Sequence, residues 1–178
     1  MRVINLYGGA GSGKSTTAAG LFFHMKSRGY KVELVQEYVK SLAWEDRTED
    51  QAFITANQNK LLHRLLGKVD YVICDASLLL TLAYLPDDYT VPSFKQYAID
   101  LYHSYDNFLD VFIKRVKPYV PMGRYEKEEE AHEKDAVILN MLKEQGIDFP
   151  IIEGDLNAPG RILRLIEVKN ELEPVQKA

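Results

Sequence analysis

The sequence of 178 residues has little cysteine and no long hydrophobic run. Its single thiol, Cys74, excludes an internal disulfide and a zinc site built from several cysteines. Because Cys74 lies in the apolar run Val72-Ile73-Cys74, we expect it to be buried and unreactive. No stretch approaches the roughly 18 consecutive apolar residues that a membrane span needs. With no secretory signal before the first expected strand, we expect a cytoplasmic protein that has no membrane partner.

An excess of positive charge is also missing. The chain carries 22 lysines and arginines against 26 aspartates and glutamates, a net charge of −4. This balance argues against a protein coated for duplex DNA, although it leaves room for a local basic groove, so nucleic acid is possible but not favoured as a partner. The length suits one α/β domain, expected over residues 1–170 and followed by a tail over 171–178.

A glycine-rich motif is the strongest signal in the chain. Residues 8–15 read Gly-Gly-Ala-Gly-Ser-Gly-Lys-Ser, which matches the phosphate-binding pattern G-x-x-x-x-G-K-[ST] between a strand-like and a helix-like segment. We expect Lys14 to reach the β- and γ-phosphates of a nucleotide and the Ser15 hydroxyl to ligate Mg²⁺. The residues expected to bind the nucleotide are Gly9, Ala10, Gly11, Ser12, Gly13, Lys14, Ser15 and Thr16.

Strand-like and helix-like segments alternate along the chain. Strands are expected at residues 3–7, 31–36, 69–75, 108–113 and 149–152, and helices at 14–28, 48–66, 77–84, 93–106, 126–144 and 159–170. The strands lack clean polar alternation, which is typical of strands buried on both faces of a parallel sheet. The pattern predicts a three-layer α/β/α fold whose ligands lie beyond the carboxyl ends of the strands.

Two carboxylates follow such strand ends. Asp75, in Cys74-Asp75-Ala76-Ser77, has the position of a Walker B aspartate and could hold the hydration shell of Mg²⁺ opposite Ser15. Its alternative role is to cap the next helix, a role also open to Ser77. Glu37 follows the second strand, where it could take or orient the proton of an acceptor hydroxyl, or could simply be a solvated loop residue.

Other residues are candidates for binding the acceptor. Gln58 lies on the apolar stripe of the helix expected at 48–66, and Gln51 lies seven residues earlier. Their amides could read the edge of a base or of an amide-bearing ring, or could contact water. Tyr84 could stack on a substrate ring. Asp135 shares a helix face with apolar residues and could pair with an arginine or touch the acceptor.

A basic segment with two prolines follows the fourth strand. We expect a lid over about 114–132, in which Arg115 and Arg124 close over the phosphates and offset charge in the transition state. The alternative is a solvated basic loop. The acidic run at 126–130 is expected to be the exposed side of its helix. The loop Gly154-Asp155 could cradle adenine with Arg161 stacked on it, although a plain turn fits equally well.

These motifs together resemble the small P-loop nucleoside and nucleotide kinases. The likeness is greatest to the AAA-type ATPase/kinase family that includes the ribosylnicotinamide kinase domain of the NadR type, whose small relatives are common in bacteriophages. It implies a five-stranded parallel sheet in order 2-3-1-4-5 and phosphorylation of a hydroxyl by ATP and Mg²⁺. It also implies phosphate and metal binding by Gly13, Lys14 and Ser15, metal support by Asp75, a base at Glu37, and lid arginines at Arg115 and Arg124. The chain lacks the Asp-Arg pair that many nucleotide kinases carry after the third strand.

The leading hypothesis is therefore a kinase that transfers the γ-phosphoryl group of ATP to a small nucleoside- or nucleotide-like acceptor, as a monomer or homodimer. Two alternatives stay open. One is an ATPase switch that binds a protein partner, and the other is a kinase that acts on a modified base within DNA.

Overall fold

The fold is built around a five-stranded parallel sheet. We describe it from a computed structural model, over residues 1–45, 49–86, 88–122 and 126–173. The strands are β1 (Arg2–Tyr7), β2 (Val32–Val35), β3 (Tyr71–Cys74), β4 (Asp106–Lys114) and β5 (Ile151–Glu153). They pair in the order β2-β3-β1-β4-β5, and every pairing is parallel. The predicted sheet and its strand order are confirmed.

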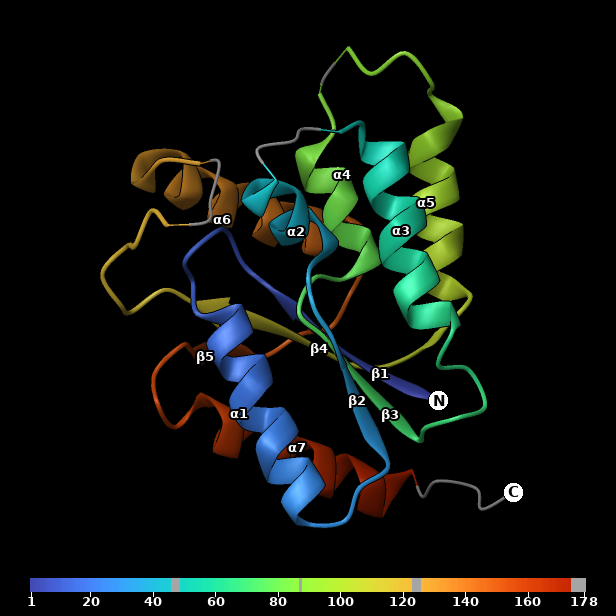
Figure 1. The fold of residues 1–178 in the computed structure, drawn as a ribbon, viewed down its shortest axis with the longest axis vertical. Helices are drawn as coiled ribbons and strands as arrows, with labels where there is room; N and C mark the ends of the chain where they lie inside the picture. Colours follow the sequence, from blue (N-terminus) through green and yellow to red (C-terminus); the bar gives the residue numbers. More distant parts are fainter. Residues whose placement is uncertain (46–48, 87, 123–125, 174–178) are drawn as a thin grey trace.

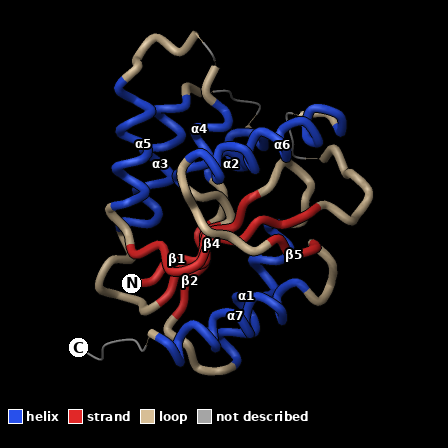
Figure 2. The backbone as a smooth tube through the Cα atoms, turned by 180° about the vertical axis from the view of Figure 1, so that it is seen from behind, coloured by secondary structure: helices blue, strands red, loops and turns tan. Residues whose placement is uncertain are grey.

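Helices cover both faces of the sheet (Figures 1 and 2). On one face lie α1 (Lys14–Ser27) and α7 (Ala158–Leu172), which pack against each other. On the opposite side lie α3 (Gln51–His63), α4 (Thr81–Tyr84), α5 (Ser93–His103) and α6 (Glu128–Glu144), together with the short α2 (Tyr38–Trp44). This arrangement is the expected three-layer α/β/α fold.

Apolar cores on both faces of the sheet hold the layers together. Between the sheet and the pair α1 and α7, Ile4, Leu21 and Ile162 are fully buried. On the other face, Phe112 packs with Ile138 of α6 and with residues of α4 and α5. Because β1 is the central strand and is covered on both faces, five of its six residues are buried. The loop that follows β1 therefore starts from a rigid base. Cys74 is fully buried, as expected, and burial raises the pKa of its thiol to about 12.

Several element boundaries differ from the predicted ones. The helix expected at 48–66 begins at Gln51, because the Asp50 carboxylate accepts the backbone N–H of Ala52 at 2.7 Å and caps it there. Thr48 lies outside the described residues. The segment expected as one helix at 77–84 is a 3₁₀ turn, η1 (Leu78–Leu80), followed by α4.

The remaining differences concern strand and helix ends. The helix expected at 93–106 ends at His103, since β4 already begins at Asp106. The third strand is shorter than residues 69–75 and keeps only its four central residues. No helix is expected from the sequence at Tyr38–Trp44, yet the structure has α2 there, and this helix lines the candidate site.

A buried polar network lies under the end of β1. The Asp110 carboxylate accepts hydrogen bonds from the Tyr7 hydroxyl at 2.7 Å, the Tyr102 hydroxyl at 2.9 Å and the Asn5 amide at 3.1 Å. Since the single phenolic hydrogen of Tyr7 goes to this carboxylate, the Ser77 hydroxyl, 2.9 Å away, donates to the Tyr7 oxygen. Three donors satisfy the buried charge. The network ties β1, β4 and α5 to the segment after β3.

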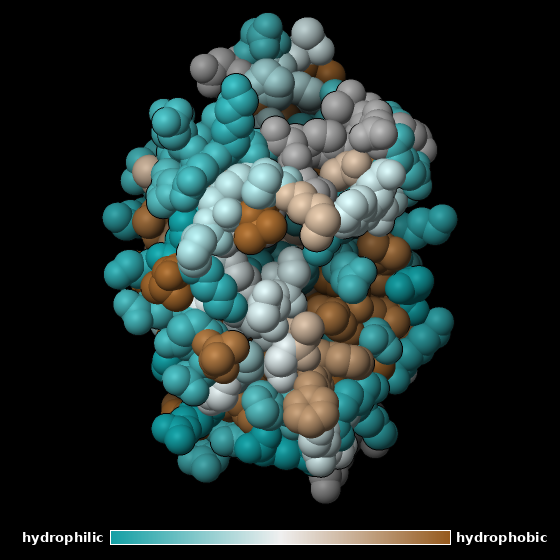
Figure 3. Space-filling model, turned by 60° about the vertical axis from the view of Figure 1, so that its left-hand side comes forward, coloured by the Kyte–Doolittle hydropathy of each residue, from teal (hydrophilic) through white to brown (hydrophobic). Residues whose placement is uncertain are grey.

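The surface is mixed in character. On the face shown in Figure 3, apolar side chains are interspersed with hydrophilic ones. Exposed apolar groups of this kind are normal on globular proteins. None of the described helices is both long and apolar enough to cross a membrane.

Candidate functional site

The glycine-rich loop joins the buried end of β1 to the start of α1. Gly13 occupies the N-cap position of α1 with φ 106°, a conformation that residues with a Cβ rarely adopt. Its own Cβ position would lie 3.2 Å from the carbonyl oxygen of Gly154, in the loop after β5. Both observations require glycine here. The loop therefore presents backbone N–H groups and the positive end of α1 to an anion, as phosphate-binding loops do.

Lys14, the first residue of α1, folds back into this loop. Its ammonium donates to the carbonyl oxygens of Gly8 at 2.6 Å and Gly9 at 3.2 Å, and the side chain is buried. Ser15 and Thr16 follow it and are exposed at the start of the helix. The ammonium group of Lys14 therefore lies against the backbone of the glycine-rich loop.

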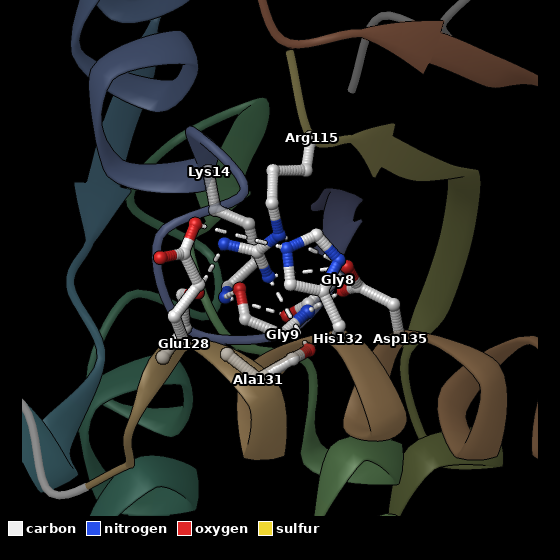
Figure 4. A network of polar contacts seen from close by, with 9 residues as sticks. Gly8, Gly9, Lys14, Arg115, Glu128, Ala131, His132 and Asp135 are labelled. Carbon is white, nitrogen blue, oxygen red and sulfur yellow. Dashed lines mark hydrogen bonds and ion pairs between the residues drawn. The ribbon is translucent and has the colours of Figure 1, made fainter. Parts of the chain in front are cut away.

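An ion pair behind the loop holds it against α6 (Figure 4). The Arg115 guanidinium donates to the Ala10 carbonyl at 2.7 Å and to the Asp135 carboxylate at 3.1 Å. The other oxygen of Asp135 accepts the backbone N–H of Gly9 at 2.5 Å. The side chains of Arg115 and Asp135 are only 6% and 17% exposed. Arg115 is therefore fixed under the loop, and Asp135 pairs with it. Arg124, the other predicted lid arginine, lies outside the described residues.

Gly9 is needed for this close approach. A Cβ at this position would lie 2.5 Å from the carbonyl oxygen of Ala131 in α6 and 2.8 Å from the Asp135 carboxylate. Contacts this short leave no room for a methyl group. The close approach of the loop to α6 at this position therefore requires glycine.

Asp75, at the end of β3, is suited to supporting a cation. It is 2% exposed, and its carboxylate lies near enough to the Ser15 hydroxyl for that hydroxyl to lower its pKa. Burial raises its pKa, while the nearby Lys14 lowers it. One carboxylate oxygen is buried without any hydrogen-bond partner. An unpartnered buried carboxylate oxygen beside a hydroxyl fits the oxygen ligands that Mg²⁺ prefers.

The described residues do not form a metal cage by themselves. Among residues 1–45, 49–86, 88–122 and 126–173, no group of three or more His, Cys, Asp or Glu could hold a metal ion. The residues present therefore fit a Mg²⁺ ion that takes the Ser15 hydroxyl and draws its other ligands from nucleotide phosphates and water, with Asp75 in support.

A cavity of about 460 Å³ extends from Lys14 and Ser15 into a chamber between the phosphate loop, α2, α3 and α4. Its size is that of a small-molecule site. The apolar part of the lining comprises Leu42, Ile54, Leu78 and Leu80, and the polar part includes Glu37, Gln51, Thr55, Gln58, Thr81, Tyr84 and Glu126. Apolar faces with a few polar groups suit a ring that has hydrogen-bonding edges.

Glu37 faces this cavity at the start of α2. It occupies the N-cap position of the helix, yet its side chain caps no backbone N–H. Burial raises its pKa; Lys14 opposes this rise, and Asp75 adds to it. The carboxyl group therefore does not cap α2, and it interacts electrostatically with Lys14 of the phosphate loop and with Asp75 of the candidate metal site.

Gln58 fixes the backbone that carries Glu37. Its amide oxygen accepts the N–H of Tyr38 at 2.8 Å, and its amide nitrogen donates to the carbonyl of Gln36 at 3.3 Å. These two bonds lie on either side of Glu37. Gln58 is 5% exposed and lines the cavity, but both ends of its amide are occupied by the protein itself. The contacts therefore favour a positioning role, in which Gln58 holds the backbone that carries Glu37. They do not favour the predicted role, in which the Gln58 amide would contact the edge of a substrate ring.

Three hydrogen-bonded polar side chains from α3 and α4 also line the chamber. The Thr81 hydroxyl donates to the Gln51 amide oxygen at 3.0 Å and lies 2.8 Å from the Thr55 hydroxyl. Tyr84 also lines the cavity, and the nearby Glu126 carboxylate contributes to raising the pKa of its hydroxyl. Gln51 and Tyr84, two predicted substrate residues, thus line the chamber. The two threonines cannot be recognised from the sequence, because one threonine on each of two separate helices forms no motif.

The loop after β5 lies on the other side of the phosphate loop. The Gly154 N–H donates to the Lys114 carbonyl at 2.8 Å, and a Cβ on Gly154 would lie 2.4 Å from the Ser12 carbonyl. Arg161 donates to the Asp155 carboxylate and to the Glu153 carbonyl, both at 2.7 Å. These bonds make the loop an ordered turn beside the phosphate loop. Arg161 therefore stays a candidate for adenine contact.

We predict that Gly9→Ala disrupts the contact between the phosphate loop and α6. Unfolding in urea should show a loss of about 1–3 kcal/mol, because the added methyl group meets backbone rather than a flexible side chain. ATP binding, measured by calorimetry, should weaken as well. The matched control is Gly160→Ala in α7, where a Cβ meets nothing within 4 Å; it should gain about 0.5–1 kcal/mol. If the two variants are equally stable, the contact between Gly9 and α6 does not exclude a side chain at position 9.

We also predict a pH-dependent effect of Asp75→Asn. Burial raises the pKa of Asp75, so the folded protein binds the proton of this carboxyl group more tightly than the unfolded chain does. At pH values above the ordinary pKa of aspartate, the ionised carboxylate therefore lowers the free energy of unfolding. The variant should therefore be more stable than the parent at pH 7 by more than about 0.5 kcal/mol, and the gain should vanish near pH 4. Mg²⁺ affinity with bound nucleotide should fall about 10- to 100-fold. Asp70→Asn, at an exposed position, is the control. If Asp75→Asn is no more stable than the parent at pH 7, the ionised Asp75 carboxylate does not destabilise the folded protein.

Solved structures share this fold. Deoxyadenosine kinase from M. mycoides, solved with the products dCMP and dCDP, superposes with a TM-score of 0.61 at 17% identity, over 96% of this chain and 100% of that chain. The NadR protein, solved with NAD and AMP-PNP, gives a TM-score of 0.66 at 16% identity over 99% of this chain. The chain spans about half of the NadR chain, 51%. At these identities the likeness shows a shared P-loop kinase fold.

Sequence comparisons agree with this placement. No curated protein sequence matches the chain significantly. The AAA domain family does match, over residues 3–158, a range that contains the phosphate loop, Glu37, Asp75 and the Arg115–Asp135 pair. The chain therefore belongs to the AAA domain family of P-loop proteins.

Proposed function

We propose that this protein is a kinase that transfers the γ-phosphoryl group of ATP to a hydroxyl group of a small nucleoside- or nucleotide-like acceptor. One observation carries the proposal: a single cavity lined by Lys14 and Ser15 of the phosphate loop extends into a chamber that Glu37 also lines. A chamber next to the phosphate loop gives room for a second substrate. Simple hydrolysis of ATP would need only a water molecule there.

The donor half of the reaction rests on the phosphate loop. Lys14 and the start of α1 would bind the β- and γ-phosphates, and Arg115 would keep the loop in its binding conformation through the Ala10 carbonyl. Ser15 and Asp75 would hold Mg²⁺, which supplies neutralisation of phosphate charge when bound.

The acceptor half rests on Glu37. The acceptor hydroxyl oxygen forms a bond to the γ-phosphorus as the bond to the bridging oxygen of ADP breaks, and the hydroxyl proton passes to the Glu37 carboxylate. Burial raises the pKa of Glu37, which makes it a better proton acceptor once ionised. The bonds from Gln58 on either side keep the carboxylate in place, so that little reorganisation is needed during the reaction.

A label-transfer experiment tests the proposal. The protein is incubated with γ-labelled ATP, Mg²⁺ and a panel of nucleosides and nucleoside monophosphates, and the products are separated. We expect label on at least one acceptor. If label appears only as inorganic phosphate, at a rate that no acceptor changes, the protein is an ATPase. Transfer only to DNA would instead favour a kinase that acts on a base within a strand.

Glu37→Gln tests the role of the base. Because Gln has the same shape and cannot take the proton, kcat for phosphoryl transfer should fall about 10²- to 10⁴-fold while ATP affinity stays the same. Steady-state kinetics and calorimetry measure the two effects. Glu33→Gln, on β2 and outside the cavity lining, serves as the control and should leave both unchanged. A Glu37→Gln variant with normal kcat would remove Glu37 from the chemistry.

A further inference from the structure

Glu126 reaches the acceptor chamber from a part of the chain expected to face solvent. It lies just before α6 and lines the cavity together with Glu37 and Tyr84. Its carboxylate lies near enough to the Tyr84 hydroxyl to contribute to the raised pKa of that phenol. It also lies near enough to Glu37 to raise the pKa of that carboxyl group. Two carboxylates, those of Glu37 and Glu126, therefore line the same chamber.

The charges of the lining favour one class of acceptor. Among the described lining residues, Glu37 and Glu126 place carboxylates beside the chamber, whereas the only cations are Lys14 and Lys40. Lys14 belongs to the donor half, since its ammonium bonds to the loop carbonyls. Lys40 is exposed.

Lys134, a third cation near the chamber, is also engaged. Its ammonium donates to the Ala83 carbonyl at 2.7 Å and lies 4.7 Å from the centre of the Tyr84 ring, and it does not line the cavity. Sites that bind phosphate groups use cations and backbone N–H groups, not a cluster of carboxylates. The described part of the chamber has the opposite character.

The chemistry of the two possible acceptors leads to the same choice. A phosphate acceptor is already anionic, so it needs no base, and a neighbouring carboxylate repels it. A hydroxyl acceptor must lose a proton, and a half-buried carboxylate such as Glu37 can receive it. Hydroxyl groups also donate hydrogen bonds readily to a second carboxylate such as Glu126.

We propose that the acceptor carries no phosphate group, and that Glu126 is a specificity-determining residue that favours such acceptors over their monophosphates. This inference rests on the proposed function. Glu126 binds hydroxyl or N–H groups of the acceptor together with Tyr84, and its charge disfavours an anion in the chamber.

The test compares nucleosides with their own 5′-monophosphates. For each pair, kcat/KM is measured with saturating ATP and Mg²⁺, and binding of both members is measured by calorimetry without turnover. We expect the nucleoside to be preferred by at least about tenfold in kcat/KM and to bind more tightly. A preference for monophosphates would overturn this inference and leave the kinase function standing. Phosphorylation of neither class would overturn the kinase function, while the binding data would still decide the inference.

A charge series at position 126 tests the residue itself. Each step from Glu126 to E126Q to E126K should reduce the preference for the nucleoside by roughly tenfold. The first step removes a negative charge that repels the phosphate of the monophosphate, and the second adds a positive charge that attracts it. E129Q and E129K are the matched controls, since Glu129 is exposed in the first turn of α6 and lines no cavity. If the position 126 variants lose activity on both classes equally, or if the control series shifts the preference by the same factor, Glu126 does not set the specificity.

Discussion

The site depends on one interaction, the buried ion pair between Arg115 and Asp135. A buried ion pair stabilises a fold only when its remaining donors and acceptors are also satisfied. Here Arg115 also bonds to the Ala10 carbonyl, and Asp135 accepts the Gly9 N–H. Both side chains of the pair therefore form hydrogen bonds with the backbone of the phosphate loop, and they hold that loop against α6 before any nucleotide binds. The same contact explains why residue 9 must be glycine.

A second fixed point lies across the cavity. The β2–α2 junction presents Glu37 to the phosphate loop, and Gln58 of α3 holds this junction by its carbonyl and N–H groups. The donor half is thus built on β1, α1 and α6, and the acceptor half on α2, α3 and α4. The sheet joins the two halves, because the carboxyl ends of β1, β2 and β3 lie at one edge. The chemistry proposed for the cavity follows from this meeting of rigid parts.

The fold could be predicted from sequence because its signals are local. The glycine-rich motif, the buried strands and the carboxylates after β2 and β3 can each be recognised within a few residues. Other parts of the site depend on contacts between distant segments. Gln58 bonds to backbone some twenty residues away, and α2 is a helix of only 7 residues. Glu126 opens an acidic run expected to be exposed, and sequence periodicity does not show that it meets Tyr84. Arg115 was expected in a closing lid, and its burial arises from α6 packing on the loop.

The central claim is that donor and acceptor sites share one cavity. Binding of a bisubstrate compound tests it most directly: adenosine joined through a polyphosphate bridge to the best acceptor nucleoside, compared by calorimetry with ATP and with the acceptor alone. If the cavity holds both halves, the linked compound should bind at least about 100-fold more tightly than ATP, since the second half binds at high effective concentration. An affinity no greater than that of ATP would show that the chamber beyond Glu37 does not receive the second substrate, and would contradict the account.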